Sequence, residues 1–581
     1  MPSNTFRVLH LDAGTGKGRF LDFGDRAAIL GGSGLAAALY QEYGLPEEDA
    51  YDPRQPLIFA IGPLTGYYPL MSKVVCAFKS PYNNYYAESH AGGRLGLTLR
   101  FAGIDALMVT GKAPTLSALA VGSNRIDRYD VHYLKGKDVY TAGKMLRRLG
   151  RETKRGHRSI IRIGPAGENG SAYACINVDS YRHFGRLGAG GVMGMKNVKA
   201  ILVQGDAVLP LPQGKEYPAL FKEIHKQLTA TDMMRKYHDL GTPANLIPLN
   251  ELKSLPWRNL QATTDPGVES ISGERFAEQL LLRQAACSGC PIGCIHIGLL
   301  RFQYASQHEY LYRQVNYDYE CIFAQGTMLG IREASDVLAI LDETEKVGLD
   351  VMSAGVALAW ATEAFQKGVV TEKETLTPLE FNNVSGYLEA IQHLGSQPNE
   401  FYRLLAQGTL VAAKHFGGED YACVLGQEMA GYATGETFFT AQALSFRHSH
   451  LDTGGYSYDQ KHAEQDAEGA VNYLMDDEVK RIKLCCMVGC LFSRNIYTDE
   501  RLGQALEAMG MADVSASIDD SSRAIRAHRL KLKAACGWKP EDAHIPKRFR
   551  EVATWKGEVD PAYLENLKNE YIRALRAVVD E

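Results

Sequence analysis

Short apolar runs are spread along the first part of the chain, up to about residue 210. Each run is four to six residues long and is bounded by Gly, Pro or a charged residue, which is typical of a buried strand. The clearest runs cover residues 56–61, 106–110, 159–163 and 200–203. We therefore expect a mixed β domain with a few helices in this part.

The pattern changes to helical spacing after a linker with three prolines at residues 205–218. Apolar residues then recur at intervals of three and four, as on one face of an amphipathic helix. Helices are predicted at residues 272–286, 332–347, 353–367, 401–416, 460–474, 477–486, 500–510 and 561–578, with a polar loop at 368–383. A glycine pair at 417–418 marks a second boundary. The pattern predicts an α+β protein, with an N-terminal mixed β domain (1–210) followed by two mostly α-helical domains (211–417 and 418–581).

Composition narrows the class of protein. Hydrophobic residues make up 45% of the 581 residues and charged residues 23%, as in ordinary globular proteins. The net charge of −5 argues against a surface dominated by nucleic-acid binding. No apolar run approaches the ~18 residues of a membrane span. The N-terminus lacks the positively charged stretch followed by an apolar stretch that is typical of a secretory signal. The eleven cysteines, an odd number, favour reduced thiols, so we expect a cytoplasmic enzyme with no nucleic-acid partner and no membrane span.

The strongest chemical signal is a group of three cysteines within eight residues, Cys287, Cys290 and Cys294. Gly and Pro between them bend the backbone, so that all three thiols can face one metal centre. A fourth ligand must come from elsewhere, and the segment 485–490 offers three more cysteines. A zinc site and simple buried thiols are the alternatives. Because a chain of 581 residues can form a large hydrophobic core, it has little need of a zinc ion for stability, and the pattern favours a [4Fe–4S] cluster.

Two glycine motifs near the N-terminus resemble nucleotide-binding loops. Residues 14–18 lack both the leading glycine and the Ser or Thr of a phosphate-binding loop, so we interpret them as a hairpin turn. Residues 32–37 match Gly-x-Gly-x-x-Ala, but residues 25–30 look helical, whereas a dinucleotide site needs a strand there. A zinc-containing, dinucleotide-dependent dehydrogenase is therefore a remote alternative.

Further glycine-rich segments occur at residues 91–94, 164–169 and 185–191. Such loops let backbone N–H groups approach phosphate closely, although turns between strands need them equally. Basic residues lie in or near these loops: Lys73, Arg94, Arg182 and Arg186. Together they favour a bulky phosphorylated cofactor.

Titratable side chains that are candidates for catalysis gather in two places. His448 and His450 are separated by one residue and followed by Asp452, which suits proton transfer or mutual orientation. In an extended segment the two imidazoles would point the same way. Cys321 directly follows Glu320 in an aromatic segment and is harder to explain as a packed thiol than the isolated cysteines.

These motifs together resemble those of the tungsten-containing aldehyde:ferredoxin oxidoreductase family. They keep the family's order and spacing over nearly the whole chain. The matching segments are residues 30–36, 60–66, 79–81, 91–93, 101–103, 164–169, 192–197, 290–294 and 348–350. The resemblance implies an N-terminal β domain that forms the base for the cofactor, with two largely helical domains closing over it.

The resemblance implies three cofactors: tungsten (or molybdenum) held by two pterins, a [4Fe–4S] cluster beside one pterin, and a Mg²⁺ ion shared by the pterin phosphates. Carried over by motif, the cluster ligands are Cys287, Cys290, Cys294 and Cys490. The positions that match cofactor contacts are Lys73, His90, Gly92, Gly93, Arg94, Arg182, His183, Gly185, Arg186 and Asp350, with the backbone of His90 and His183 at the Mg²⁺ ion. The chain departs from the family pattern at Glu345, where an Asp is usual, and in a second pterin motif that has lost its Leu before Cys490.

The resemblance also implies the chemistry. Glu320 matches the family's active-site carboxylate and His450 its active-site histidine, with His448 a near alternative. A carboxylate can accept the proton of water while an imidazole polarises the carbonyl oxygen, so the expected reaction oxidises an aldehyde with water to a carboxylic acid. Electrons would leave singly through the cluster to a ferredoxin or an iron–sulfur partner subunit, with or without a flavin subunit.

The family includes members with other substrates, so the catalytic subunit of an aryl-CoA reductase of the benzoyl-CoA type is the alternative. In that branch a protein cysteine ligates the metal, and Cys321 is the candidate tungsten ligand. We also expect an oligomer. The iron that bridges some family dimers through Glu-x-x-His should be absent, because Ala339 and Asp342 stand at those positions.

Overall fold

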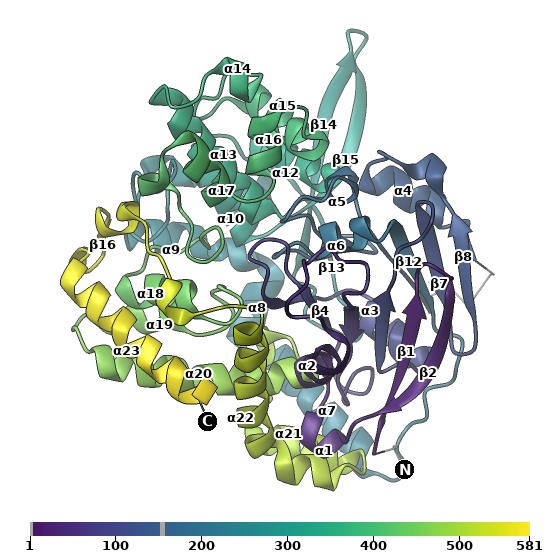
Figure 1. Ribbon diagram of the computed structural model, residues 1–581. Helices are drawn as coiled ribbons and strands as arrows, with labels where there is room; N and C mark the ends of the chain where they lie inside the picture. The colour runs from purple at the N-terminus through teal and green to yellow at the C-terminus, as the bar shows by residue number, and fades with distance from the viewer. Residues whose placement is uncertain (1–3, 151–156, 581) are drawn as a thin grey trace.

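The computed structural model describes residues 4–150 and 157–580. Two six-stranded sheets near the N-terminus are followed by a largely helical remainder that packs beside them (Figure 1). This arrangement confirms the predicted α+β class, whereas the domain limits near residues 210 and 417 stay predictions. Within the described ranges, no helix combines the length and the apolar character needed to cross a bilayer.

The two sheets have the strand orders β2-β1-β6-β3-β4-β5 and β11-β10-β9-β12-β7-β8. The strands are β1 Phe6–Asp12, β2 Lys17–Phe23, β3 Leu57–Ala60, β4 Val74–Lys79, β5 Tyr86–Ala91, β6 Ala106–Thr110, β7 Ser117–Val121, β8 Ile126–Asp130, β9 Arg158–Arg162, β10 Ile176–Val178, β11 Arg182–Phe184 and β12 Val198–Gln204. The four apolar runs of the sequence form β3, β6, β9 and β12, as predicted. Residues 14–18 include the turn of the antiparallel β1–β2 hairpin, which is also as predicted.

The core follows from the alternation of side chains along the strands. In β1, Leu9 and Leu11 belong to the core between the two sheets, whereas Phe6 and Val8 pack with helices on the outer face. Helix α2 (Gly32–Tyr43) contacts β3 and β4 on that face. The glycine motif at its start follows another helix, so it lacks the strand that a dinucleotide site requires.

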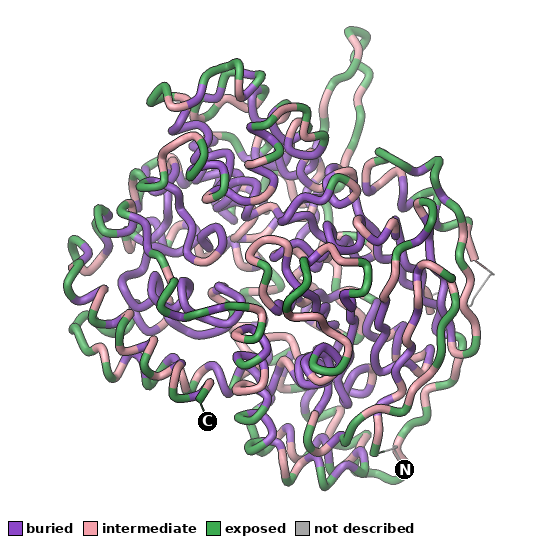
Figure 2. The backbone as a smooth tube through the Cα atoms, viewed as in Figure 1, coloured by how far each residue is buried: buried purple, intermediate pink, exposed green. Residues whose placement is uncertain are grey.

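Helices dominate the rest of the chain, and Figure 2 shows much of their backbone buried. The N-terminal part contributes α1 Arg26–Ile29, α3 Leu95–Phe101, α4 Val139–Leu146, α5 Pro165–Glu168 and α6 Ala189–Met195. The remainder contributes α7 Glu216–Ala230, α8 Asp232–Asp239, α9 Leu246–Glu251, α10 Gly273–Gln279, α11 Tyr319–Ile322, α12 Ala334–Val347, α13 Val351–Gln366, α14 Glu372–Thr375, α15 Val384–Ser396, α16 Glu400–Leu405, α17 Thr409–Phe416, α18 Glu436–Leu444, α19 Gly455–Asp459, α20 Ala467–Met487, α21 Asp499–Ala508, α22 Ala512–Ala535 and α23 Pro561–Asp580.

The predicted helix at 272–286 is correct only in its first half. Helix α10 ends at Gln279, and β13 (Leu281–Ala285) follows because it pairs with β14 (Ile295–Ala305). Strand β14 continues into a hairpin with β15 (Glu309–Tyr317), which the apolar pattern did not indicate. A further small hairpin, β16 Ala553–Thr554 and β17 Gly557–Glu558, lies near the C-terminus.

Three further predicted helices have different limits. The helix expected at 401–416 is interrupted at Gly408, whose φ of +133° suits glycine alone, and so it forms α16 and α17. The helices expected at 460–474 and 477–486 are one continuous helix, α20, which starts later because the Asp466 side chain caps its first turn. The loop expected at 368–383 holds the short helix α14, and the long helix α22 was not predicted.

Candidate active site

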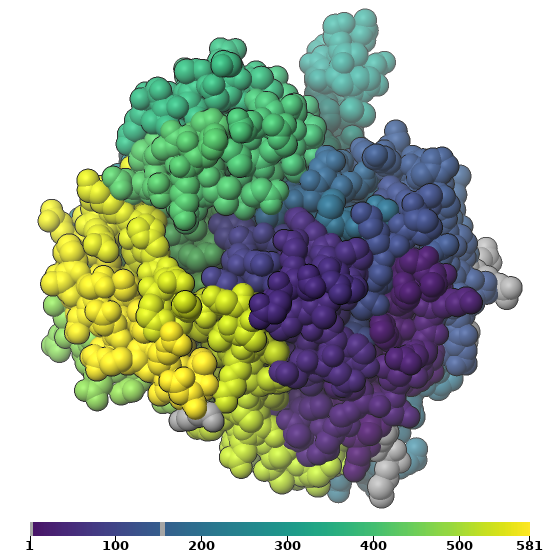
Figure 3. Space-filling view, in the orientation of Figure 1, coloured from purple at the N-terminus to yellow at the C-terminus, as the bar shows by residue number. Residues whose placement is uncertain are grey.

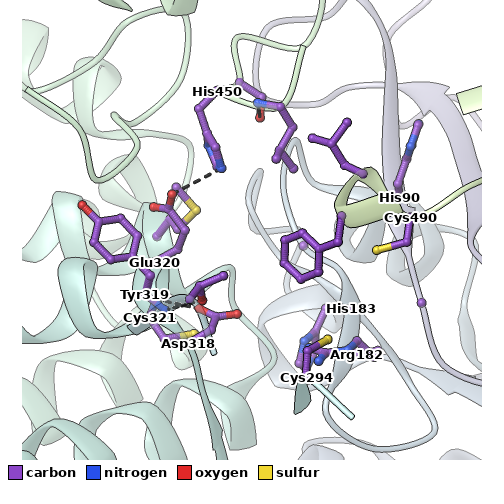
Figure 4. A pocket seen from close by; sticks show the side chains of 18 of the residues that line it. His90, Arg182, His183, Cys294, Asp318, Tyr319, Glu320, Cys321, His450 and Cys490 are labelled. Carbon is purple, nitrogen blue, oxygen red and sulfur yellow. Dashed lines mark hydrogen bonds and ion pairs between the residues drawn. The ribbon is translucent and has the colours of Figure 1, made fainter. Parts of the chain in front are cut away.

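A cavity of about 620 Å³ lies between the N-terminal sheets and the helical part. The four predicted cluster cysteines line it, as do Glu320 and His450. Figure 4 shows Glu320 and His450 on one side, with Cys490 and Cys294 across the open space. The structure therefore brings the predicted catalytic and cluster residues, taken from segments far apart in the chain, to one place.

The cysteines converge from two segments. Cys287, Cys290 and Cys294 lie in or beside the loop between β13 and β14, and Cys490 comes shortly after α20. Burial raises the pKa of Cys290 to about 12, and the thiols of Cys490, Cys294 and Cys287 contribute to the rise. Such mutual influence requires the four sulfur atoms to be near one another.

The spacing of these thiols is wider than a single ion needs. Among the described residues, no group of three or more His, Cys, Asp or Glu side chains is close enough to hold one metal ion. Thiolates around one zinc, each about 2.3 Å from it, would lie only ~3.8 Å from each other. A [4Fe–4S] cluster binds each thiolate to a separate iron atom, so a wider set of cysteines is compatible with it.

Two basic side chains, Arg182 and Lys73, and the backbone at Gly92 lie close to Cys287. Burial acts to raise the pKa of this thiol, but Arg182, Lys73 and a backbone hydrogen bond from Gly93 outweigh it, and the pKa is lowered. A Cβ at Gly92 would come within 2.6 Å of Cys287 Sγ, so that position has room for glycine alone. Both observations fit a thiolate that ligates a cluster.

Polar groups from the second sheet and the middle helices line another side. Arg186 Nε lies 3.3 Å from Asp350 Oδ2, and Asp350 also caps α13 by accepting a hydrogen bond from the Ser353 N–H at 2.9 Å. His183 Nε2 lies 2.7 Å from Glu345 Oε1. Arg186 Nη1 is buried without a hydrogen-bond partner in the described structure. A buried, unpaired guanidinium nitrogen fits an anionic group such as a phosphate.

His90 and Gly185 line the cavity, as do the other predicted cofactor residues Lys73, Gly92, Arg182, His183, Arg186 and Asp350. Gly93 lies next to this wall and accepts a hydrogen bond from the Ser288 N–H at 3.0 Å. Arg94 lies apart from these residues. It precedes α3, does not line the cavity, and directs a guanidinium that is 52% exposed toward Asp179 at 3.5 Å. Its predicted cofactor contact stays a prediction.

Glu320 and His450 form a pair. Glu320 lies in the first turn of α11, where the Asp318 side chain accepts a hydrogen bond from the Cys321 N–H. Glu320 Oε1 lies 3.3 Å from His450 Nε2, and Oε2 accepts a hydrogen bond from the Gly431 N–H at 3.1 Å. Both side chains are largely buried, so bulk water has little access to the pair.

Burial decides the charge of this pair. It raises the pKa of Glu320 to about 8. Burial, together with the charges of Arg186 and Arg481, lowers the pKa of His450 to about 3. Near neutral pH the proton therefore resides mainly on the carboxyl group and the imidazole is neutral. His450 is thus suited to donate a hydrogen bond as a neutral imidazole, because charging a buried ring beside two arginines is costly.

His448 lies in a different environment. Its φ of +53° shows that the segment is a turn and not extended, so the two imidazoles do not share a direction. Its Nδ1 lies 3.0 Å from the Ala443 carbonyl oxygen and its Nε2 3.1 Å from Lys533 Nζ. With both ring nitrogens occupied, His448 is placed to hold the turn that carries His450.

We expect the two histidines to respond differently to substitution. His450→Asn should lower turnover about tenfold to a hundredfold with cofactors retained, because one hydrogen-bond donor at the reacting group is lost. His448→Asn should instead lower the thermal midpoint and change turnover less. Turnover rates and melting curves of the two variants check this, and the reverse order would transfer the role to His448.

Several residues that line the site were not predicted. Tyr432 packs against the His450 ring with a centroid distance of 5.3 Å and stacks on Tyr456 at 4.7 Å. Arg481 donates a hydrogen bond to the Leu451 carbonyl oxygen at 3.1 Å and so fixes the backbone next to His450. These residues come from separate segments, and no local spacing marks them.

Cys321 lines the cavity, but its surroundings favour the thiol form. Burial and the nearby Asp318 carboxylate raise its pKa well above the usual value. In Figure 4 its sulfur lies beside Asp318. The possible role as a tungsten ligand stays a prediction.

Comparison with known proteins places the chain among its relatives. Residues 8–205 match the N-terminal domain of aldehyde ferredoxin oxidoreductase, and residues 219–575 match its domains 2 and 3. The tungsten-containing aldehyde ferredoxin oxidoreductase of Pyrococcus furiosus is 30% identical over 427 residues, which is 72% of this chain and 68% of that protein. The aliphatic sulfonate oxidoreductase, WOR-like subunit, of the same organism is 29% identical over 402 residues, 66% of this chain and 62% of that protein.

A solved structure supports the fold. The active site complex BamBC of benzoyl coenzyme A reductase with 1,5-dienoyl-CoA has a chain that superposes with a TM-score of 0.79, covering 98% of this chain and 94% of that one. The identity is 18%, so this likeness concerns the fold alone. With both family regions matched over most of its length, the chain belongs to the aldehyde ferredoxin oxidoreductase family of oxidoreductases.

Proposed function

We propose that this protein oxidises aldehydes with water to carboxylic acids and passes the electrons through a [4Fe–4S] cluster to an iron–sulfur carrier. The observation that carries the proposal is the Glu320–His450 pair facing four cysteines across one cavity. A relative named as a tungsten-containing aldehyde ferredoxin oxidoreductase supports the same reaction.

The residues present fit the cofactors that this reaction needs. Cys287, Cys290, Cys294 and Cys490 would hold the cluster, with Gly92 leaving room for the first sulfur. Lys73, Arg182 and Arg186 would bind the phosphates of two pterins, and the unpaired Nη1 of Arg186 supplies one donor. When bound, a tungsten bis-pterin supplies a two-electron acceptor, and the cluster supplies the one-electron exit.

The protein groups handle the proton. In the resting pair the proton is on the Glu320 carboxyl group, whose Oε1 lies 3.3 Å from His450 Nε2. After it is lost, the Glu320 carboxylate can accept a proton from the attacking water, while the Gly431 N–H stabilises its other oxygen. His450, neutral at working pH, polarises the aldehyde oxygen as a hydrogen-bond donor and not as an acid. Burial around the pair excludes bulk water from competing hydrogen bonds.

The rate should depend on pH through Glu320. Because its pKa is raised to about 8, the carboxylate that acts as base is a minor form at pH 7 and becomes dominant above pH ~8. We therefore expect kcat to rise as pH increases from about 6 to 9, with its midpoint near the pKa of Glu320. Steady-state rates across this range, at constant metal content, test the expectation, and a rate that falls with rising pH would contradict it.

A second candidate is reduction of the aromatic ring of an aryl-CoA, which is favoured by the presence of Cys321 at the cavity wall. The two candidates separate in one experiment. The purified protein is offered an oxidised viologen dye together with an aldehyde in one assay and with a cyclic 1,5-dienoyl-CoA in the other. Acid formation with dye reduction supports aldehyde oxidation, whereas dye reduction with formation of benzoyl-CoA, and no aldehyde turnover, would support the alternative.

A further inference from the structure

The β14–β15 hairpin extends away from the body of the protein (Figures 1 and 3). Its base is packed: Leu300 and Val315 belong to the large helical core. Beyond them, residues 301–314 form what we call the arm. Three large side chains of the arm are exposed: Tyr304 is 58% exposed, Tyr312 56% and Leu311 38%.

The arm is poorly stabilised by its own contacts. A two-stranded hairpin is marginally stable in water unless another element covers it. Strand β13 pairs with β14 only as far as Gly298, so beyond that point the described structure shows no third strand beside β14. Phe302 and Leu311 lie opposite each other and share one face, while Arg301 and Tyr312 share the other. Large side chains and an unpaired strand edge together are typical of a surface that another protein covers.

The position of the arm in the sequence indicates which kind of protein covers it. Strand β14 begins directly after the cluster ligand Cys294, and β15 ends directly before the turn that carries Glu320. The 11 residues of β14, at ~3.3 Å each, extend about 36 Å from the cluster loop. A small domain is ~30 Å across, so a partner lying along the arm also reaches the cluster loop. Near its base such a partner would meet Leu282 and Arg283 of β13, both exposed.

Charge indicates the chemistry of the partner. From residue 281 to 317 the chain contains three arginines, at 283, 301 and 313, and a single acidic residue, Glu309. This segment is thus positive in a chain whose net charge is −5. A positive docking surface beside an electron exit attracts an acidic partner and increases its rate of encounter.

We infer that the arm and the adjoining β13 edge are the docking site for a small acidic iron–sulfur electron carrier. The inference rests on the proposed function, which supplies the electrons. If Cys287, Cys290, Cys294 and Cys490 hold the cluster, each encounter would transfer one electron from it to one cluster of the carrier, with no bond formed or broken. Two encounters, or two clusters on one carrier, remove the electron pair of one aldehyde.

The test uses the whole loaded enzyme and a purified acidic ferredoxin with two [4Fe–4S] clusters as the probe. Two variants alter the site: Tyr304→Ser removes an exposed aromatic anchor, and the pair Arg283→Glu with Arg301→Glu reverses charge. Arg523→Glu, an exposed charge reversal on α22, is the matched control. Reduction of a small viologen dye by aldehyde reports catalysis without docking.

For the site variants we expect the KM for ferredoxin to rise about tenfold with dye reduction unchanged, and the charge-reversed pair to lose most of the salt dependence seen in the unaltered enzyme. The control should match the unaltered enzyme in both assays. Equal ferredoxin kinetics in all proteins would overturn the inference, as would an unaltered enzyme that reduces the dye but not ferredoxin. Dissociation of an oligomer by the site variants, with ferredoxin kinetics intact, would show that a second copy covers the arm.

The proposed function can fail separately. If the unaltered enzyme shows no aldehyde-dependent dye reduction, the reaction is wrong, and docking is then measured by binding of the same ferredoxin. Weaker binding to the site variants than to the Arg523→Glu protein would still support the docking site. Equal binding would overturn it.

Discussion

Replacing Glu320 by Gln should lower aldehyde oxidation about 10²–10⁴-fold while tungsten and iron are retained. The amide keeps the shape of the side chain and can still face His450, 3.3 Å away in the unaltered protein, but it cannot accept a proton. The rise of rate with pH should disappear in this variant, since the group with a pKa of about 8 is gone. Steady-state kinetics and metal analysis of the same preparation measure both effects.

The matched control is Glu478→Gln. Glu478 is also buried, and burial raises its pKa to about 7, but it lies on α20 and does not line the cavity. This variant should keep its pH profile and most of its rate. A Glu320→Gln enzyme with a normal rate and full metal content would exclude Glu320 as the base.

Replacing Cys290 by Ala should remove the cluster and the electron exit. Four thiolates hold a [4Fe–4S] cluster, and the loss of one leaves an iron atom open to solvent and to oxidation. We expect iron content and the visible absorbance of the cluster to fall, and aldehyde-dependent dye reduction to be largely lost, while part of the tungsten persists. Iron analysis and absorbance spectra of the purified variant check this.

The control for this prediction is Cys536→Ala. Its thiol is also partly buried, but it lies 3.8 Å from the Tyr40 hydroxyl, outside the cavity. This variant should keep full iron. Full iron in the Cys290→Ala protein, and in the corresponding changes at Cys287 and Cys294, would remove the cluster assignment.

Much of the fold was predictable because local pattern and tertiary structure agree. The four apolar runs became strands, since each is short and bounded by turn residues. The prediction failed where distant pairing overrides local spacing. Residues 281–285 have apolar side chains compatible with a helix, but they form β13 because β14 offers hydrogen bonds to them. The β14–β15 hairpin was missed because β14 is largely buried only as far as Leu300, most of β15 is exposed or half-buried, and neither strand shows a clear apolar–polar alternation.

The candidate site, like the fold, could be predicted from the sequence only in part. The cysteines, Glu320 and His450 lie in short segments whose residue types are informative by themselves. The direction of the Arg94 side chain could not be predicted, because its position after a glycine pair leaves that direction to Asp179 of another segment. Tyr432 and Arg481 approach His450 only after folding, so no single segment reveals them. The charge of the pair likewise could not be predicted, because it depends on burial.

The most direct test is to measure tungsten, iron and aldehyde-dependent dye reduction in one preparation of the purified protein. We predict about one tungsten and about four iron atoms per chain, and reduction of a viologen dye with formation of the carboxylic acid when an aldehyde is added. A preparation that contains zinc without tungsten or iron, or one fully loaded with both metals that oxidises no aldehyde, would contradict the proposed function.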